Sequence, residues 1–486
     1  MVQIPRLCLD CIGEAFCREH AISAAEYGGI YRFEYEGYTV TVNGLPCPVR
    51  LCRESAIPFN RPWPGYQRPL DQTEEAGYVT FSADQEVTVR VECAASFERA
   101  TVRPLSKEVS VRREGQTVEF TLKEHGGYVL ELDDMHHALH VFFNPVKSPA
   151  TEATYFFGPG VHFAGIITLK DGESVYIDPE AIVFGSINSL GAKGIRIFGG
   201  GVLNGSTERR ILEHCYENFT KGTIRLYHCT DVVIEDVILQ DSATWVLSLF
   251  HCDGVTIDNL KTVGHWRYNT DGIDVVNTSN VVIRNSFIRS FDDTVTIKAI
   301  YGYDRPVENI RTEHCVLWCG WGRTCEIGLE TDAPEYRNIV FRDCDLIHNS
   351  KVALDVHNGS GGELHHIYFE DLRVEYSTAT TREIVQRSDE QVYGETEIYA
   401  PCLIAALNKK FHIYETAGMI HDIYFRNIQA VAEDGVPVPE VIFSSFDPAV
   451  VLHGFYVDGV TWNGQPVPLD FFEVTVENAE DIQWKL

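Results

Sequence analysis

The sequence predicts an all-β protein in which an N-terminal β-sandwich, residues 1–152, precedes a parallel β-helix, residues 153–486. Two observations predict this arrangement. Residues 31–132 alternate apolar and polar side chains in short runs that end at Gly, Asn or Pro, which is typical of antiparallel strands. From about residue 155 onward one short phrase recurs at a nearly constant period, which indicates a stack of similar coils.

The N-terminal alternation is clearest in three runs, at residues 31–35, 87–91 and 117–122. About 150 residues of such short strands suit a β-sandwich, whose two sheets bury every second side chain. We expect this domain to be a structural or substrate-shaping appendage.

The recurring phrase consists of two or three β-branched or apolar residues, a polar residue, and then Asp or Asn in most copies. Its aligned central positions are Ile234, Ile257, Ile283, Thr312, Phe341, Phe369 and Phe425. As far as Phe369, successive members differ in number by 23, 26, 29, 29 and 28. The last interval, from Phe369 to Phe425, is about twice as long and reads as two periods.

Each repeat holds very short strands and shows no helical period. Asp and Asn stand at the turns, where they tolerate a left-handed backbone. These features favour a parallel β-helix with coils about 4.8 Å apart. A β-propeller is the alternative, but its repeats are longer and need hairpins within each blade. Residues 377–412 break the rhythm and predict an insertion beside the coils.

Three aspartates form the candidate catalytic group: Asp271, Asp292 and Asp293. In a solenoid, residues one period apart lie close in space, and 21 positions separate Asp271 from Asp292. We therefore expect these two side chains on the same surface of adjacent coils. Strand neighbours point to opposite faces, so Asp293 can join them only if the backbone bends there. The alternative role for Asp271 is to cap a turn, and we expect Asp274 to support that turn.

Glycoside hydrolysis requires such a group of carboxyl residues. One carboxylic acid protonates the leaving oxygen, and a carboxylate activates water or attacks carbon. Crowded like charges raise one pKa, which supplies the acid near neutral pH. The three aspartates therefore predict an enzyme that cuts glycosidic bonds.

The stretch Asn269-Thr270-Asp271-Gly272-Ile273-Asp274, followed by Asp292-Asp293, resembles glycoside hydrolase family 28, the polygalacturonases. The resemblance covers about residues 155–377 and includes the Gly-rich stretch 199–205. It implies a right-handed, pectin-lyase-like β-helix and inversion at the anomeric carbon. It also implies that Asp292 is the general acid and that Asp271 and Asp293 position and deprotonate water. The two-domain layout is similar to family 49, the dextranases and isopullulanases.

Two departures from family 28 bear on the substrate. Arg323 stands where that family has the His of a Gly-His-Gly element, and Leu354 and Val356 stand at the two positions of its Arg-x-Lys motif. That motif binds the galacturonate carboxylate, for which Arg and Lys are natural partners. We therefore expect a substrate other than galacturonan: a neutral sugar, or a uronide that is bound in another way by Arg323.

Several polar and aromatic residues near the aspartates are candidates for substrate binding. Aromatic faces stack on sugar rings but also fill β-helix cores, and Arg323 with Glu326 could instead form a structural ion pair. Lys298 is expected to be a solvated strand residue or a contact at the edge of the site. The candidates are Asn269, His265, Trp266, Trp321, Arg323, Glu326 and His357, and Tyr301 also flanks the cluster.

Composition excludes several classes of function. A formal charge of −30 disfavours nucleic-acid binding. The sequence contains no run of 18 apolar residues, so we expect no membrane-spanning helix. The 14 Cys show no regular pairing pattern, and the first residues lack a secretory h-region, so we expect a cytoplasmic location unless a signal peptide has been lost. Cys8, Cys11, Cys17 and His20 lack a second half with ligand spacing, so we expect no metal and no cofactor.

Two other functions compete with hydrolysis. A polysaccharide lyase also uses a β-helix, but it needs a base and commonly Ca²⁺ to neutralise a uronate. A non-catalytic glycan-binding protein would hold sugar without turnover. The partner in each case is an oligosaccharide or polysaccharide, and the oligomeric state is open.

Overall fold

The computed structural model describes residues 2–6, 32–60, 68, 70–208, 222–300, 304–386, 399–409 and 417–486. Cys8, Cys11, Cys17, His20 and Tyr301 lie outside these ranges. Within them the helices are three short 3-10 turns, η1 (Leu70–Gln72), η2 (Leu105–Lys107) and η3 (Leu469–Phe471). No helix in the described ranges is long and apolar enough to cross a membrane.

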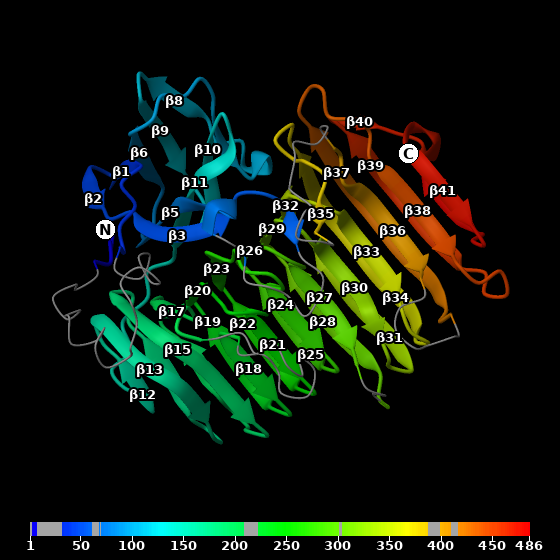
Figure 1. The fold of residues 1–486 in the computed structure, drawn as a ribbon, viewed down its shortest axis with the longest axis horizontal. Coiled ribbons are helices and arrows are strands. Elements are labelled where there is room, and N and C mark those ends of the chain that lie inside the picture. The colour runs from blue at the N-terminus through cyan, green and yellow to red at the C-terminus, as the bar shows by residue number, and fades with distance from the viewer. Residues whose placement is uncertain are drawn as a thin grey trace.

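Two five-stranded sheets make up the N-terminal domain (Figure 1). The first has the order β2 (Leu45–Cys47), β1 (Tyr38–Val42), β6 (Val87–Cys93), β9 (Thr117–Leu122) and β8 (Val111–Glu114). The second has the order β3 (Arg50–Ser55), β5 (Thr73–Ser82), β11 (Asp134–Asn144), β10 (Gly126–Leu132) and β7 (Ala100–Arg103). Inward side chains of both sheets form one core, for example Val89 and Val118 against Leu130 and Leu139, all buried, as in a sandwich.

The rest of the described chain forms a solenoid of 30 strands, coloured from teal to red in Figure 1. In chain order the strands are β12 (Tyr155–Phe157), β13 (Gly160–Leu169), β14 (Ser174–Ile177), β15 (Ala181–Leu190), β16 (Arg196–Phe198), β17 (Val202–Asn204), β18 (Ile224–Tyr227), β19 (Thr230–Glu235), β20 (Ile238–Gln240), β21 (Leu247–Phe250), β22 (Asp253–Asp258), β23 (Lys261–Val263), β24 (Ile273–Val276), β25 (Ser279–Arg284), β26 (Phe287–Ser290), β27 (Val295–Ala299), β28 (Val307–Glu313), β29 (Val316–Cys319), β30 (Arg323–Thr331), β31 (Glu335–Arg342), β32 (Asp345–His348), β33 (Val352–Asn358), β34 (Glu363–Tyr376), β36 (Cys402–Asn408), β37 (Ile420–Ala432), β38 (Glu440–Ser445), β39 (His453–Trp462), β40 (Gln465–Pro466), β41 (Glu473–Glu477) and β42 (Ile482–Lys485). Two further strands, β4 (Phe59–Asn60) and β35 (Ile384–Val385), pair with each other across the two parts of the chain.

Three parallel ladders run along the solenoid, because each strand pairs with the strand one coil later. Their inward side chains form one continuous apolar core from Ile167 to Phe472. The residue that ends each copy of the recurring phrase has a positive φ, between 49° and 67°, as expected for Asp and Asn at turns. These residues are Asp236, Asn259, Asn285, His314, Asp343, Asp371 and Asn427. The predicted fold class, a parallel β-helix behind an N-terminal β-sandwich, is confirmed.

The predicted alignment of the repeats is confirmed at every position as far as Phe369, each pairing with its counterpart on the next coil. The reading of the last interval as two periods is wrong, because Phe369 pairs directly with Phe425. A single coil therefore spans the whole interval, and it is long because it contains the expected insertion. Part of that insertion, β36, joins the ladder beside β33, while residues 387–398 and 410–416 lie outside the described ranges.

The second sheet of the sandwich covers the ladder that runs from β17 through β26 to β32 (Figure 1). Tyr78 and Phe142 of the sandwich pack with Phe287 of β26 and Trp318 of β29 in a buried apolar cluster. The sandwich backbone approaches the solenoid closely at Gly127, where a Cβ atom would lie 2.5 Å from the Phe287 ring. The sandwich thus fixes β26, the strand that ends two residues before Asp292.

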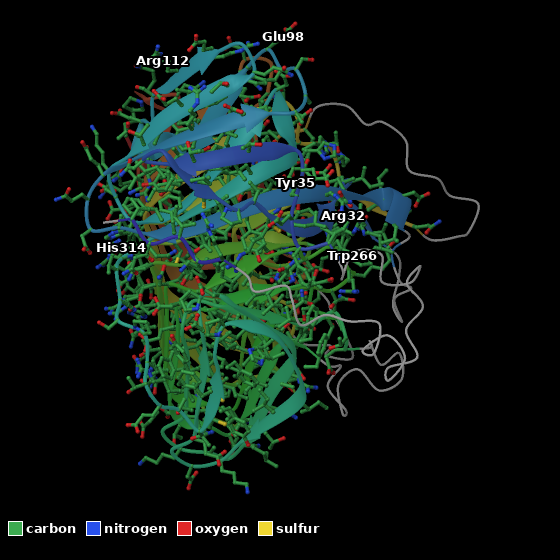
Figure 2. All side chains as sticks on the ribbon, turned by 90° about the vertical axis from the view of Figure 1, so that its left-hand side faces the viewer. Arg32, Tyr35, Glu98, Arg112, Trp266 and His314 are labelled. Carbon is green, nitrogen blue, oxygen red and sulfur yellow. The ribbon has the colours of Figure 1, made fainter. Side chains whose placement is uncertain are left out.

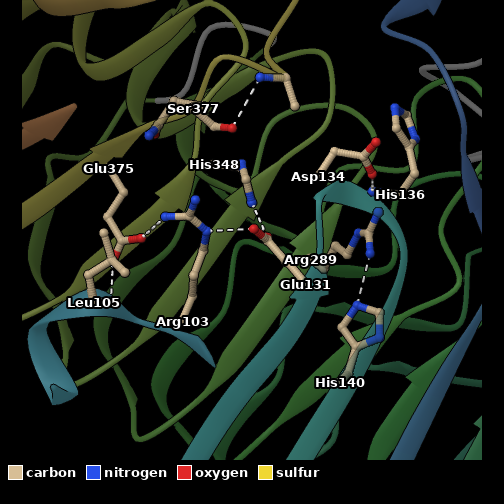
Figure 3. Close-up of polar contacts among 12 residues, drawn as sticks. Arg103, Leu105, Glu131, Asp134, His136, His140, Arg289, His348, Glu375 and Ser377 are labelled. Carbon is tan, nitrogen blue, oxygen red and sulfur yellow. Dashed lines mark hydrogen bonds and ion pairs between the residues drawn. The ribbon is translucent and has the colours of Figure 1, made fainter. Parts of the chain in front are cut away.

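Buried charges also cross this seam (Figure 3). Arg103 of the sandwich forms ion pairs with Glu131 of its own sheet, at 2.7 Å, and with Glu375 of β34. Arg289 of β26 lies 3.4 Å from Glu54 and donates to Nε2 of His140 at 2.9 Å. Each cation therefore contacts a carboxylate that is as deeply buried as itself, which is the arrangement that buried charges require.

Candidate active site

Four consecutive strands of one ladder, β24, β27, β30 and β33, carry a row of polar residues beside the predicted aspartates. Asp274 pairs in register with Thr296, Thr296 with Glu326, and Glu326 with Asp355. Side chains alternate along a strand, and the neighbours that point into the solenoid core are Val275, Ile297, Ile327 and Val356. Asp274, Glu326 and Asp355 therefore point away from that core, in one row along the solenoid.

Asp271 and Asp293 occupy equivalent turns on adjacent coils. The pairing of β24 with β27 sets Asp293 opposite Asp271, and the Gly272 amide donates to the carbonyl oxygen of Asp293 at 2.8 Å. The sequence spacing predicts Asp292 at that place instead. The actual offset is one position longer, so the second aspartate of the pair stacks on Asp271.

The backbone bends at residues 291, 292 and 294, as a shared site for Asp292 and Asp293 requires. Ser290 Oγ donates to the carbonyl oxygen of Asp292 at 2.7 Å, and the Asp293 amide donates to Asp292 Oδ1 at 3.1 Å. The exposed fractions are 3% for Asp271, 6% for Asp292 and 8% for Asp293. The three carboxyl groups therefore share a nearly dry environment, in which charges interact strongly.

Two buried cations hold this acidic group together. Lys298 Nζ lies 3.2 Å from Asp271 Oδ2 and 3.0 Å from Asp274 Oδ1. Lys298 is 4% exposed, so the expectation of a solvated strand residue is wrong, whereas its contact with Asp271 agrees with the alternative of a contact to the site. The alternation of side chains along β27 predicts that Lys298 points away from the solenoid core and into solvent. The outward row to which Lys298 belongs is nevertheless buried.

Arg323 is the second cation, and three carboxylates surround it. Its Nε lies 2.7 Å from Asp355 Oδ2, and its Nη1 lies 3.4 Å from Glu326 Oε1 and 3.9 Å from Asp293 Oδ1. The Arg323 amide also donates to Asp293 Oδ1 at 2.8 Å. The ion pair of Arg323 with Glu326 that the sequence left open is thus present.

The environments push the pKa values of the acid pair apart. Burial and then the charge of Asp293 raise the pKa of Asp292 to about 6. Burial alone would also raise the pKa of Asp293, but Arg323 and Lys298 hold it below its ordinary value. Burial and Asp274 raise the pKa of Asp271, and Lys298 opposes them. One carboxylic acid beside one carboxylate is the combination that acid–base catalysis needs.

His265 and Trp266 contact residues other than the three aspartates. His265 is 1% exposed and lines a cavity of about 40 Å³ at the seam with the sandwich, together with Glu54 and His348. Burial lowers the pKa of His265 to about 3. Trp266 lies where the sandwich meets the solenoid (Figure 2), and its Nε1 donates to Asp241 Oδ1 at 3.0 Å.

Two other candidates, Asn269 and Trp321, lie beside the turns that carry the acids. Asn269 has a positive φ of 54°, which shapes the turn that leads to Asp271. The Trp321 ring stacks near Phe291, with centroids 6.2 Å apart, and Lys351 Nζ lies 3.0 Å from the Trp321 centroid. These contacts place Trp321 directly beside the backbone bend of the acid pair.

His357 follows Asp355 on the same outward row, with Nδ1 3.9 Å from Asp355 Oδ2. Burial and the nearby Arg323 hold the pKa of His357 well below its ordinary value, so the ring is neutral. Leu354 and Val356, the residues at the basic positions of family 28, are core residues with no exposed surface. Period-two alternation of β33 would have revealed this, because Asp355 and His357 alternate with them.

A match to known enzymes accompanies this geometry. Residues 147–386, just under half of the chain, match the family model described as glycosyl hydrolases family 28. The resemblance that the Asn-Thr-Asp and Asp-Asp motifs predict is therefore confirmed.

Curated relatives share a segment of the chain. A probable rhamnogalacturonase B of Aspergillus terreus is 28% identical over 30% of this chain and 26% of that protein. Rhamnogalacturonase A of Emericella nidulans is 29% identical over 32% of this chain and 30% of that protein. The chain thus spans less than a third of the length of these relatives.

The solved structure of Dex49A from Penicillium minioluteum covers 90% of this chain and 90% of its own, with a TM-score of 0.62 and 11% identity. At that identity the likeness concerns the fold, and it extends over both the sandwich and the solenoid.

Proposed function

We propose that this protein is a glycoside hydrolase that cleaves an oligosaccharide or polysaccharide with inversion at the anomeric carbon. The observation that carries the proposal is the convergence of Asp271, Asp292 and Asp293 on adjacent coils with opposed pKa shifts. The match of residues 147–386 to glycosyl hydrolases family 28 supports it.

The opposed pKa shifts of Asp292 and Asp293 support an acid and a base in this pair. Asp292, with a pKa of about 6, donates its proton to the glycosidic oxygen as the bond to the anomeric carbon breaks. A water molecule attacks that carbon from the opposite face, and its proton passes to a carboxylate supplied by Asp271 and Asp293. The new bond forms on the face opposite the leaving group, so the configuration inverts.

The substrate that we propose is not galacturonan. The outward positions on the coil after Arg323 are Asp355 and His357, and Arg323 already contacts the carboxyl groups of Asp293, Glu326 and Asp355. A carboxylate of the substrate would have to compete with these three groups for the guanidinium. The names of the curated relatives make rhamnogalacturonan the first polysaccharide to test.

The test is a panel of defined saccharides, including rhamnogalacturonan, dextran and polygalacturonate, with new reducing ends as the readout. We expect turnover of a substrate that contains neutral sugars and little or none of polygalacturonate. NMR of the first product should show the anomer opposite to that of the substrate. A product with the retained anomer would contradict the mechanism, and polygalacturonate as the best substrate would contradict the specificity.

Gly322 provides a test of the geometry of the acid pair. A Cβ atom at Gly322 would lie 2.4 Å from Asp293 Oδ1 and 2.5 Å from Asp293 N, so Gly322→Ala must displace Asp293. We expect kcat to fall by ~10²-fold, because misplacement by about 1 Å has that effect on catalysis. Gly158→Ala is the matched control, since its Cβ atom would meet its nearest neighbour at 3.7 Å. Equal kcat for Gly322→Ala and the control would contradict the placement of Asp293 in the site.

Lys351 is the reason to keep a polysaccharide lyase as the second candidate. Burial and the charge of Arg323 lower its pKa, and Asp292 is among the carboxylates that oppose them. A lysine that loses its proton readily can act as the base of an elimination. A lyase would release an unsaturated product that absorbs in the ultraviolet, whereas hydrolysis releases none.

A glycan-binding protein would hold the saccharide without either product. The cytoplasmic location stays a prediction.

A further inference from the structure

Asp271 and Asp293 differ in which of their oxygens are engaged. Asp293 Oδ1 accepts from the Arg323 amide at 2.8 Å and lies 3.9 Å from the Arg323 guanidinium. Asp271 Oδ2 accepts from Lys298 at 3.2 Å, whereas Asp271 Oδ1 has no hydrogen-bond partner among the described residues although it is buried. An acceptor oxygen that is buried and unpartnered is suited to a bound water molecule.

Lys298 is fixed on three sides. Its ammonium contacts Asp271 and Asp274, and it lies 4.5 Å from the centroid of the Trp245 ring. Asp274 has no exposed surface and Lys298 has 4%. A buried ammonium between two carboxylates cannot turn toward solvent, so its position is set by the register of β24 and β27.

We propose that Lys298 is a positioning residue that favours the ionised form of Asp271 and leaves its Oδ1 as the acceptor of the proton of the attacking water. The inference rests on the proposed hydrolysis. It gives separate roles to Asp271 and Asp293, which the proposed function treats together. Asp271 is the base, and Asp293 orients Arg323 and stabilises the proton on Asp292. In the step itself, the water oxygen bonds to the anomeric carbon, one water proton moves to Asp271 Oδ1, and the leaving oxygen takes the proton of Asp292.

The charges around Asp271 make a cation necessary for this role. Asp274, Asp292 and Asp293 all surround Asp271, and like charges in a buried site favour the neutral acid. Lys298 is the opposing charge in direct contact with Asp271. Without it, burial and the neighbouring carboxylates would act on Asp271 unopposed and favour the neutral acid, which cannot accept a proton. Arg323 cannot replace Lys298, because its contacts are with Asp293, Glu326 and Asp355.

The experiment compares Lys298→Gln and Lys298→Arg with the wild-type protein on the saccharide that the panel identifies. Gln keeps a hydrogen-bond donor without the charge, and Arg keeps the charge. We expect Lys298→Gln to lower kcat by ~10²-fold or more with little change in KM. We also expect it to move the acidic limb of the pH–kcat profile upward by at least about one pH unit, because a free base must lose its proton at that limb. Lys298→Arg should keep the limb near its wild-type position.

The outcomes separate a positioning role from a structural one. If Lys298→Gln lowers the melting temperature but leaves the acidic limb unchanged, Lys298 only stabilises the fold and the inference is overturned. Lys193→Met is the matched control, since Lys193 is exposed on the same solenoid and lies 3.5 Å from Asp231. It should change neither kcat nor the limb.

A second measurement applies if the Lys298 variants do not fold. The carboxyl ¹³C shifts of labelled Asp in the wild-type protein, assigned with Asp271→Asn, report the titration of Asp271 directly. A carboxyl group that is protonated at the pH of maximal turnover would overturn the inference. Failure of the wild-type protein to release reducing ends from any saccharide would instead contradict the proposed function, so the two failures are distinguishable.

Discussion

Asp292→Asn is expected to abolish nearly all turnover while the protein keeps its fold. The side chain of Asp292 is the general acid, and its loss should lower kcat by about 10²- to 10⁴-fold, the usual contribution of such a group. Asn has almost the same shape, so the backbone contacts at Ser290 and Asp293 can persist. The melting temperature should therefore stay close to that of the wild-type protein.

The pH profile gives a second readout of the same group. Asp292 must be protonated to act, and its pKa is about 6. The wild-type rate should therefore fall as the pH rises through about 6, by tenfold per unit once most Asp292 is ionised. Asp292→Asn should lack this basic limb in whatever activity remains.

Asp253→Asn is the control for the loss of a carboxylate from the solenoid. Asp253 is exposed on β22 and accepts from Asn280 at 2.8 Å, and we expect this variant to keep full activity. If Asp292→Asn and Asp253→Asn hydrolyse the saccharide at the same rate, Asp292 is not the acid and the three-aspartate mechanism fails.

The sequence was informative where a pattern depends on the backbone alone. Seven aligned positions from Ile234 to Phe425 form one inward row, because each coil must bury an apolar side chain at the same place. The pairing of Asp271 with Asp293 rather than Asp292 was missed. Turn lengths in a solenoid vary from coil to coil, so spacing alone does not fix the register.

Residues whose environment depends on distant segments could not be predicted. Lys298 alternates with core residues on β27, which predicts an exposed side chain. Asp271 and Asp274 of the preceding coil nevertheless contact it. His265 is adjacent to Trp266 and near the aspartates in sequence, but it lines the seam with Glu54 of the sandwich. Neither contact leaves a signal in local sequence, because both partners come from other parts of the chain.

Arg103→Met is expected to lower the free energy of unfolding by about 3–5 kcal/mol, the usual cost of removing one partner of a buried ion pair. The Arg103 side chain is 3% exposed, and it contacts Glu131 and Glu375 with exposed fractions of 5% and 2% (Figure 3). The substitution leaves both carboxylates buried without their guanidinium. Denaturant unfolding measures the change. Arg112→Met is the control, because Arg112 is 77% exposed at the outer surface of the sandwich (Figure 2) and its ion pair at 3.9 Å contributes less than about 1 kcal/mol.

The effect of Arg103→Met should depend on pH in a direction that the two carboxylates determine. Burial would raise the pKa of Glu131, but His348 and Arg103 lower it to about 2, so its stabilising contribution is present above its unfolded pKa and is lost as the pH falls toward 2. Burial raises the pKa of Glu375 to about 7 even beside Arg103. Glu375 therefore destabilises the folded state increasingly as the pH rises toward 7, and without Arg103 this loss continues to higher pH. The difference between wild type and Arg103→Met should thus widen from pH 5 to pH 8, and a constant difference would show that Arg103 acts through packing rather than through its charge.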